Sequence, residues 1–70
     1  MDTITAREVL ALPPEALPGV HTDEDEDSAG DCWRALRLLA ASEIWEGRVM
    51  GSILYATSSR WSGRRRIVAA

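Results

Sequence analysis

A run of acidic residues constrains the fold of this chain more than any other feature of its sequence. The segment from His21 to Asp31 reads HTDEDEDSAGD and holds six carboxylates in eleven residues. No apolar residue stands between Val20 and Ala29, so this stretch has nothing to bury in a core. We therefore expect a solvated acidic loop at about residues 21–28, with folded elements on either side of it.

The length of the chain, 70 residues, allows a single small domain, which we take to be residues 1–70. A domain of this size buries only about 60% of the surface that its unfolded chain exposes. One cysteine excludes an internal disulfide, and Cys32 with His21 supplies too few ligands for a structural zinc site. Oligomerisation, as a homodimer for example, or docking on a larger partner would supply the missing stability.

The first residues and the cysteine content bear on location. The N-terminal sequence MDTITARE lacks the basic segment of a signal peptide, and no apolar run approaches the length of a membrane span. A single cysteine fits a reducing compartment. We expect a soluble, cytoplasmic protein without membrane contact.

Charge is strongly segregated along the chain. Residues 1–31 hold nine acidic residues and one arginine, a formal charge of −8, whereas residues 32–70 hold seven arginines and two glutamates, a formal charge of +5. Such asymmetry predicts either internal neutralisation on folding or two surfaces for charged partners. All eight Lys and Arg positions are arginines, which a codon bias explains better than a binding role does, because the neutral residues are skewed too.

The N-terminal segment carries a helix-start signal. Thr5-Ala6-Arg7-Glu8 has the spacing of a capping box, in which the threonine hydroxyl and the glutamate satisfy the first amides of a helix. Pro13-Pro14 ends the segment. Within residues 3–12 we predict a helix of two turns, followed by a proline-stiffened connector with one irregular helical turn.

A longer helix is predicted from about Ala29 to Glu46, ended by Gly47. One broad apolar stripe at helical spacing contains Cys32, Trp33, Leu36, Leu39, Ala40 and Ile44. A second apolar patch, Leu38 with Trp45, lies on the other side. A helix that is apolar on two sides is covered twice or shared with another chain, so this patch predicts a dimer seam or a docking surface.

The C-terminal third has two competing interpretations. Val49, Ile53, Tyr55 and Thr57 alternate as β-forming residues, SSRWSG has turn chemistry, and Ile67 and Val68 follow, which together predict a β-hairpin. Val49, Ile53 and Ala56 also match a helical period. The fold class that we predict is α+β: a short N-terminal helix, one long helix and a C-terminal β-hairpin. The alternative is a small all-α helical bundle.

Neither metal binding nor catalysis is supported by motif. Asp23, Asp25 and Asp27 have the rhythm of a calcium loop, but Ser28 stands where its glycine belongs and Arg34 where its glutamate belongs. Cys32 on a helix stripe is more typical of a small core residue than of a nucleophile. No catalytic, cofactor-binding or metal-binding residue is therefore predicted, and we expect a protein that is not an enzyme and uses no cofactor.

Binding to a macromolecule is what the charges favour. Asp23, Glu24, Asp25, Glu26, Asp27 and Asp31 could steer the chain toward a basic surface on a larger protein or ribonucleoprotein. Stoichiometric binding as an inhibitor or adaptor is the function that we predict. By analogy of size and charge alone, the class that we expect is the small accessory proteins of phages and mobile elements, anti-CRISPR and antitoxin-like factors among them.

The alternative function is nucleic-acid binding through the arginine-rich hairpin. Arg60, Trp61, Arg64, Arg65 and Arg66 could contact phosphates and stack on a base. The acidic balance of the whole chain, with a pI of about 4.9, argues against this alternative.

Overall fold

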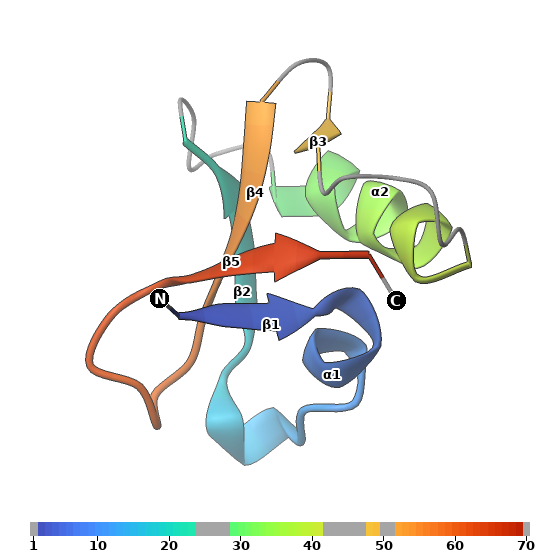
Figure 1. The fold of residues 1–70 in the computed structure, drawn as a ribbon. Helices are drawn as coiled ribbons and strands as arrows, with labels where there is room; N and C mark the ends of the chain where they lie inside the picture. The colour runs from blue at the N-terminus through green and yellow to red at the C-terminus, as the bar shows by residue number, and fades with distance from the viewer. Residues whose placement is uncertain (1, 24–28, 42–47, 50–51, 70) are drawn as a thin grey trace.

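The computed structural model describes residues 2–23, 29–41, 48–49 and 52–69 of the chain (Figure 1). In chain order the elements are β1 (Thr3–Thr5), α1 (Ala6–Leu10), the short 3₁₀ helix η1 (Pro14–Ala16), β2 (Gly19–Thr22), α2 (Ala29–Ala41), β3 (Arg48–Val49), β4 (Ser52–Thr57) and β5 (Arg65–Val68).

The strands form one mixed sheet. They pair in the order β1-β5-β4-β2, and β3 pairs with the first residues of β4. β5 is antiparallel to β4 and parallel to β1, while β2 is antiparallel to β4. Segments from opposite ends of the sequence are therefore neighbours, with Ile4 opposite Ile67.

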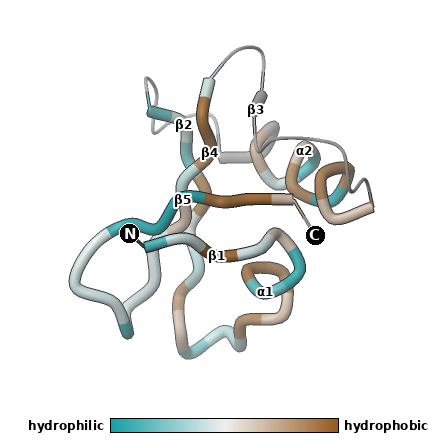
Figure 2. The backbone as a smooth tube through the Cα atoms, viewed as in Figure 1, coloured by the Kyte–Doolittle hydropathy of each residue, from teal (hydrophilic) through white to brown (hydrophobic). Residues whose placement is uncertain are grey.

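The core lies between the sheet and the two helices. Alternate strand residues point to opposite faces of a sheet, and the face toward the helices carries the buried apolar residues. The sheet contributes Ile4, Val20, Leu54, Ala56 and Ile67, α1 contributes Ala6 and Val9, and α2 contributes Cys32, Leu36 and Leu39. Figure 2 shows these apolar segments of the sheet and helices as brown stretches.

Helix α1 begins as its sequence predicts. Thr5 is extended, with φ −80° and ψ 156°, and its Oγ1 accepts a hydrogen bond from the amide of Glu8 at 3.2 Å. The Thr5 hydroxyl in turn donates to the Glu8 carboxylate at 3.0 Å. The predicted N-cap is thus confirmed, although the helix is shorter than predicted and Thr3–Thr5 is a strand.

Helix α2 presents the predicted apolar stripe to the sheet. Cys32, Leu36 and Leu39 are buried, and Trp33 and Ala40 pack against the core. Leu38, on the other side of the helix, is 61% exposed. The predicted continuation of this helix to Glu46, with Ile44 and Trp45, lies outside the described residues.

The connector between α1 and β2 is tied to the turn between β4 and β5. The Ser58 hydroxyl donates to the carbonyl of Ala16 at 2.6 Å, and the Ser59 amide donates to the same oxygen at 3.0 Å. Leu17 then takes a left-handed backbone conformation, φ 45° and ψ 58°, and is 69% exposed. These hydrogen bonds hold the connector against the turn, although the backbone of Leu17 is strained.

The predicted α+β class is confirmed, and the all-α bundle is wrong. Residues 52–57 and 65–68 pair antiparallel with each other as the two strands of a hairpin. Each of the two strands also pairs with an outer strand of the sheet. The competing helix is therefore wrong. β1 and β2 were not predicted. His21 and Thr22, expected in the acidic loop, pair instead with Tyr55 and Leu54 in the sheet.

The buried face of β4 is not the face that carries Ile53, Tyr55 and Thr57, the alternating β-forming residues noted in the sequence. Leu54 and Ala56 are fully buried, whereas Ile53 and Tyr55 are half-buried and Thr57 is exposed. Among the described residues, no helix is both long and apolar enough to cross a membrane.

Candidate functional site

The face of the sheet opposite the helices, here called the helix-free face, carries a row of polar and aromatic side chains. The strand register sets Thr3 of β1 beside Arg66 of β5, Arg66 beside Tyr55 of β4, and Tyr55 beside His21 of β2. Directly opposed residues on neighbouring strands point to the same face. The four side chains therefore cross the whole sheet in one line.

Tyr55 lies at the centre of this row. The guanidinium carbon of Arg64 lies 3.9 Å from the centroid of the tyrosine ring, in a cation–π contact. The His21 ring is stacked on Tyr55, with ring centroids 6.1 Å apart and ring planes 25° apart. One tyrosine thus holds a guanidinium and an imidazole in fixed positions on the helix-free face.

Arg66 adds a second guanidinium beside the same tyrosine. Its side chain is half-buried, and its Nε atom is buried without a hydrogen-bond partner among the described residues. A buried N–H group that makes no hydrogen bond costs free energy, so Arg66 is not placed here to the benefit of stability alone. Arg64 and Arg66 are therefore two cations suited to receive anionic oxygen atoms.

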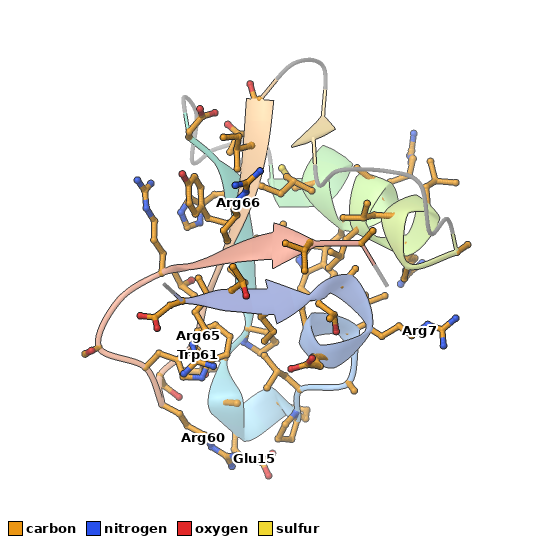
Figure 3. The ribbon with its side chains drawn as sticks, in the orientation of Figure 1. Arg7, Glu15, Arg60, Trp61, Arg65 and Arg66 are labelled. Atoms are coloured by element: carbon orange, nitrogen blue, oxygen red, sulfur yellow. The ribbon has the colours of Figure 1, made fainter. Side chains whose placement is uncertain are left out.

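Arg65 and Trp61 lie apart from this pair. Arg65 is opposite the buried Ala56, and its guanidinium carbon is 4.2 Å from the centroid of the Trp61 ring. Trp61 packs against the core. Figure 3 shows Arg65 beside Trp61, both at a distance from Arg66, with Arg60 pointing outward near Glu15.

The predicted ribbon of four arginines and one tryptophan is therefore divided. Strand alternation places Arg64 and Arg66 on the helix-free face and Arg65 on the other. From the sequence, Trp61 was predicted to be the aromatic partner of the arginines. Tyr55 and His21, which lie beside Arg64 and Arg66, were not assigned to a site. The signal that could have found them is the pairing of β4 with both β2 and β5, which no local pattern encodes.

The acidic segment is described only at its start. Asp23 follows β2 and is exposed, and its amide donates to the carbonyl of Ile53 at 3.2 Å. Glu24, Asp25, Glu26 and Asp27 lie outside the described residues, and Asp31 is described only as a backbone position in α2. Contact of these carboxylates with a partner stays a prediction.

The other predicted surface is likewise seen in part. Leu38 is exposed on α2, whereas Trp45 lies outside the described residues. Leu17, which was not predicted, is another large apolar side chain that is mostly exposed. A dimer seam or docking surface at Leu38 stays a prediction.

Cys32 is 1% exposed and belongs to the core cluster, as its place on the apolar stripe of α2 predicts. His21 lies on the helix-free face, so the sheet separates the two side chains. In the described ranges, no three His, Cys, Asp or Glu side chains are grouped as a metal would need.

Comparisons with protein-family models, curated proteins and solved structures found no match to this chain. The helix-free face is therefore interpreted from its own chemistry.

Proposed function

We propose that this protein is a non-enzymatic binding protein that holds a nucleic acid stoichiometrically against the helix-free face of its sheet. The observation that carries the proposal is the placement of Arg64 and Arg66 beside Tyr55, with the buried Nε of Arg66 lacking a hydrogen-bond partner among the described residues.

The chemistry of these groups favours phosphate. A guanidinium offers several N–H donors in a planar fork that matches the oxygen atoms of a phosphate, and it stays charged at every physiological pH. Two guanidinium groups next to two aromatic rings combine the charge and the flat apolar surface that nucleic-acid sites use. The negative charge of the sequence is concentrated at residues 23–31, whereas Arg64 and Arg66 come from its basic half.

A stoichiometric role is supported by the separation of the two most reactive side chains. Cys32 lies in the core and His21 on the opposite face of the sheet, so the cysteine and the imidazole cannot act as a nucleophile and its base. A nucleic-acid ligand also agrees with the cytoplasmic location expected from the sequence.

The test is a binding titration with labelled DNA and RNA oligonucleotides at several salt concentrations. The double variant Arg64→Ala with Arg66→Ala should bind at least about tenfold more weakly. Its affinity should also depend less on salt, with the slope of log affinity against log salt reduced by about two.

A matched control removes the same charge elsewhere. Arg7 and Arg60 are exposed, and Figure 3 shows the two pointing away from Arg66 on other sides of the molecule. Arg7→Ala with Arg60→Ala should retain most of the affinity. Equal losses in the two double variants would mean that only net charge matters, and the proposed site would be wrong.

A second candidate function is binding to a basic surface of a larger protein or ribonucleoprotein through the acidic residues. It is favoured by the six carboxylates between His21 and Asp31, of which Asp23 is exposed directly after β2. An inhibitor, adaptor, anti-CRISPR or antitoxin-like role, as well as a homodimer formed through Leu38 and Trp45, would belong to this candidate.

One variant separates the two candidates by the sign of its effect. Replacing Asp23, Glu24, Asp25, Glu26 and Asp27 by Ser or Asn removes five negative charges. If nucleic acid is the ligand, oligonucleotide affinity should rise, because repulsion of phosphate is removed. If a basic protein is the partner, its affinity for this chain should fall severalfold while oligonucleotide binding stays absent.

A further inference from the structure

Resting on the proposed function, we infer that the ligand is a single strand and that the guanidinium of Arg64, which lies over the Tyr55 ring, is the surface on which a base stacks.

The shape of the helix-free face argues against a duplex. Sequence readout of a duplex commonly uses a helix or a β-ribbon that enters the major groove, which is about 8.5 Å deep, whereas the row of side chains around Tyr55 lies on the face of the sheet. The described helices pack on the other face of the sheet (Figure 1). Tyr55, His21 and Arg66 are half-buried and so lie close to the sheet surface rather than projecting from it. Side chains that lie close to the surface of the sheet suit bases that are already unstacked.

Arg64 supplies a planar surface that faces solvent. Its guanidinium lies 3.9 Å from the centroid of the Tyr55 ring, and the residue as a whole is exposed. The guanidinium therefore contacts the tyrosine, while the exposed residue stays accessible to a ligand. Bases stack on guanidinium planes as well as on aromatic rings. Because the tyrosine already contacts the guanidinium before the ligand arrives, less side-chain entropy is lost on binding than for an arginine without such a contact.

Arg66 and His21 place further groups along the same line. Tyr55 has Arg66 beside it on β5 and His21 beside it on β2. Neighbouring strands are about 4.8 Å apart. A strand lying across the sheet would meet in turn the Arg66 guanidinium, the Arg64 and Tyr55 stack, and the His21 ring. The guanidinium of Arg66 would then donate to a phosphate oxygen or to a base edge.

The decisive variant is Arg64→Lys, which keeps the positive charge and removes the plane. Single-strand affinity should fall about five- to tenfold, since stacking on one side chain contributes that much or more. Duplex affinity and the salt dependence of binding should stay nearly unchanged, because the number of cations is the same. Arg60→Lys, the same exchange at an exposed arginine outside the site, should change neither affinity.

A second pair of variants tests the role of tyrosine. Tyr55→Phe keeps the ring beneath Arg64 and should retain the preference for a single strand. Tyr55→Leu removes the ring and should reduce that preference about as far as Arg64→Lys does. Circular dichroism of each variant verifies that the fold is present before affinities are compared.

The possible outcomes distinguish this inference from the function on which it rests. Equal affinity for single strands and duplexes, unchanged by Arg64→Lys but weakened by the Arg64→Ala, Arg66→Ala double variant, would overturn the inference and leave nucleic-acid binding in place. Absence of any oligonucleotide binding at low salt would overturn both. Binding of polyglutamate as tight as that of the single strand, unaffected by Arg64→Lys, would identify a site for acidic proteins instead.

Discussion

The two faces of the sheet are built from different kinds of residues, although they alternate along the same strands. In β4, Leu54 and Ala56 are fully buried under the helices, while Ile53 and Tyr55 are half-buried on the helix-free face. In β5, Ile67 enters the core and Arg66 faces away from it. The helix-covered face is filled for stability, whereas the helix-free face carries cations and rings whose presence a small core does not require.

The largest expected effect comes from comparing Leu54→Ala with Ile53→Ala, adjacent residues on opposite faces. Leu54→Ala should reduce the free energy of unfolding by about 2–5 kcal/mol, because it removes a fully buried side chain and leaves a cavity. Ile53→Ala should cost about 1 kcal/mol, since its side chain is only half-buried. Urea denaturation followed by circular dichroism measures both values. Equal costs would mean that the two faces contribute alike to stability.

A smaller effect is expected at the N-cap of α1, which belongs to the helix-covered side. Thr5→Ala removes the hydroxyl that accepts the Glu8 amide, and the free energy of unfolding should fall by about 1 kcal/mol. Thr3→Ala is the matched control, because Thr3 lies in the same strand, is exposed and caps no helix. A loss at Thr3 as large as that at Thr5 would contradict the capping role.

The smallest effect, opposite in sign, is expected at Arg66. Arg66→Met keeps the apolar stem and removes the buried N–H group that makes no hydrogen bond among the described residues, so stability should rise by up to about 1 kcal/mol while oligonucleotide affinity falls. Arg64→Met removes the same charge from an exposed position and should leave the free energy of unfolding nearly unchanged. Thermal melts and the binding titration together provide the measurement. Destabilisation by Arg66→Met would indicate that Arg66 serves the fold.

Local signals in the sequence predicted the helices well. The capping box at Thr5 and Glu8 and the stripe of Cys32, Leu36 and Leu39 act within one or two helical turns, and both are present in the structure. The hairpin of β4 and β5 was predicted for the same reason, since the turn chemistry between its strands lies in a single short stretch.

Pairing between distant segments is what the sequence did not reveal. β1 is three residues long and becomes a strand because Ile4 and its neighbours pair with residues 66–68 near the other end of the sequence. β2 was hidden because its last residues precede the acidic run directly and its partner is β4. The candidate site depends on both pairings. Tyr55, Arg66 and His21 are separated in sequence, and only the strand register brings them into one row.

The pairing of β1 with β5 also bears on how the chain acquires its fold during synthesis. A nascent chain cannot complete this sheet until Arg65–Val68 has left the ribosomal tunnel, because Ile4 has no other strand beside it in the described chain. Translation interrupted before Arg65 would therefore leave the core without Ile67 and leave β1 without its partner strand. Cellular proteases would be expected to remove such a fragment quickly.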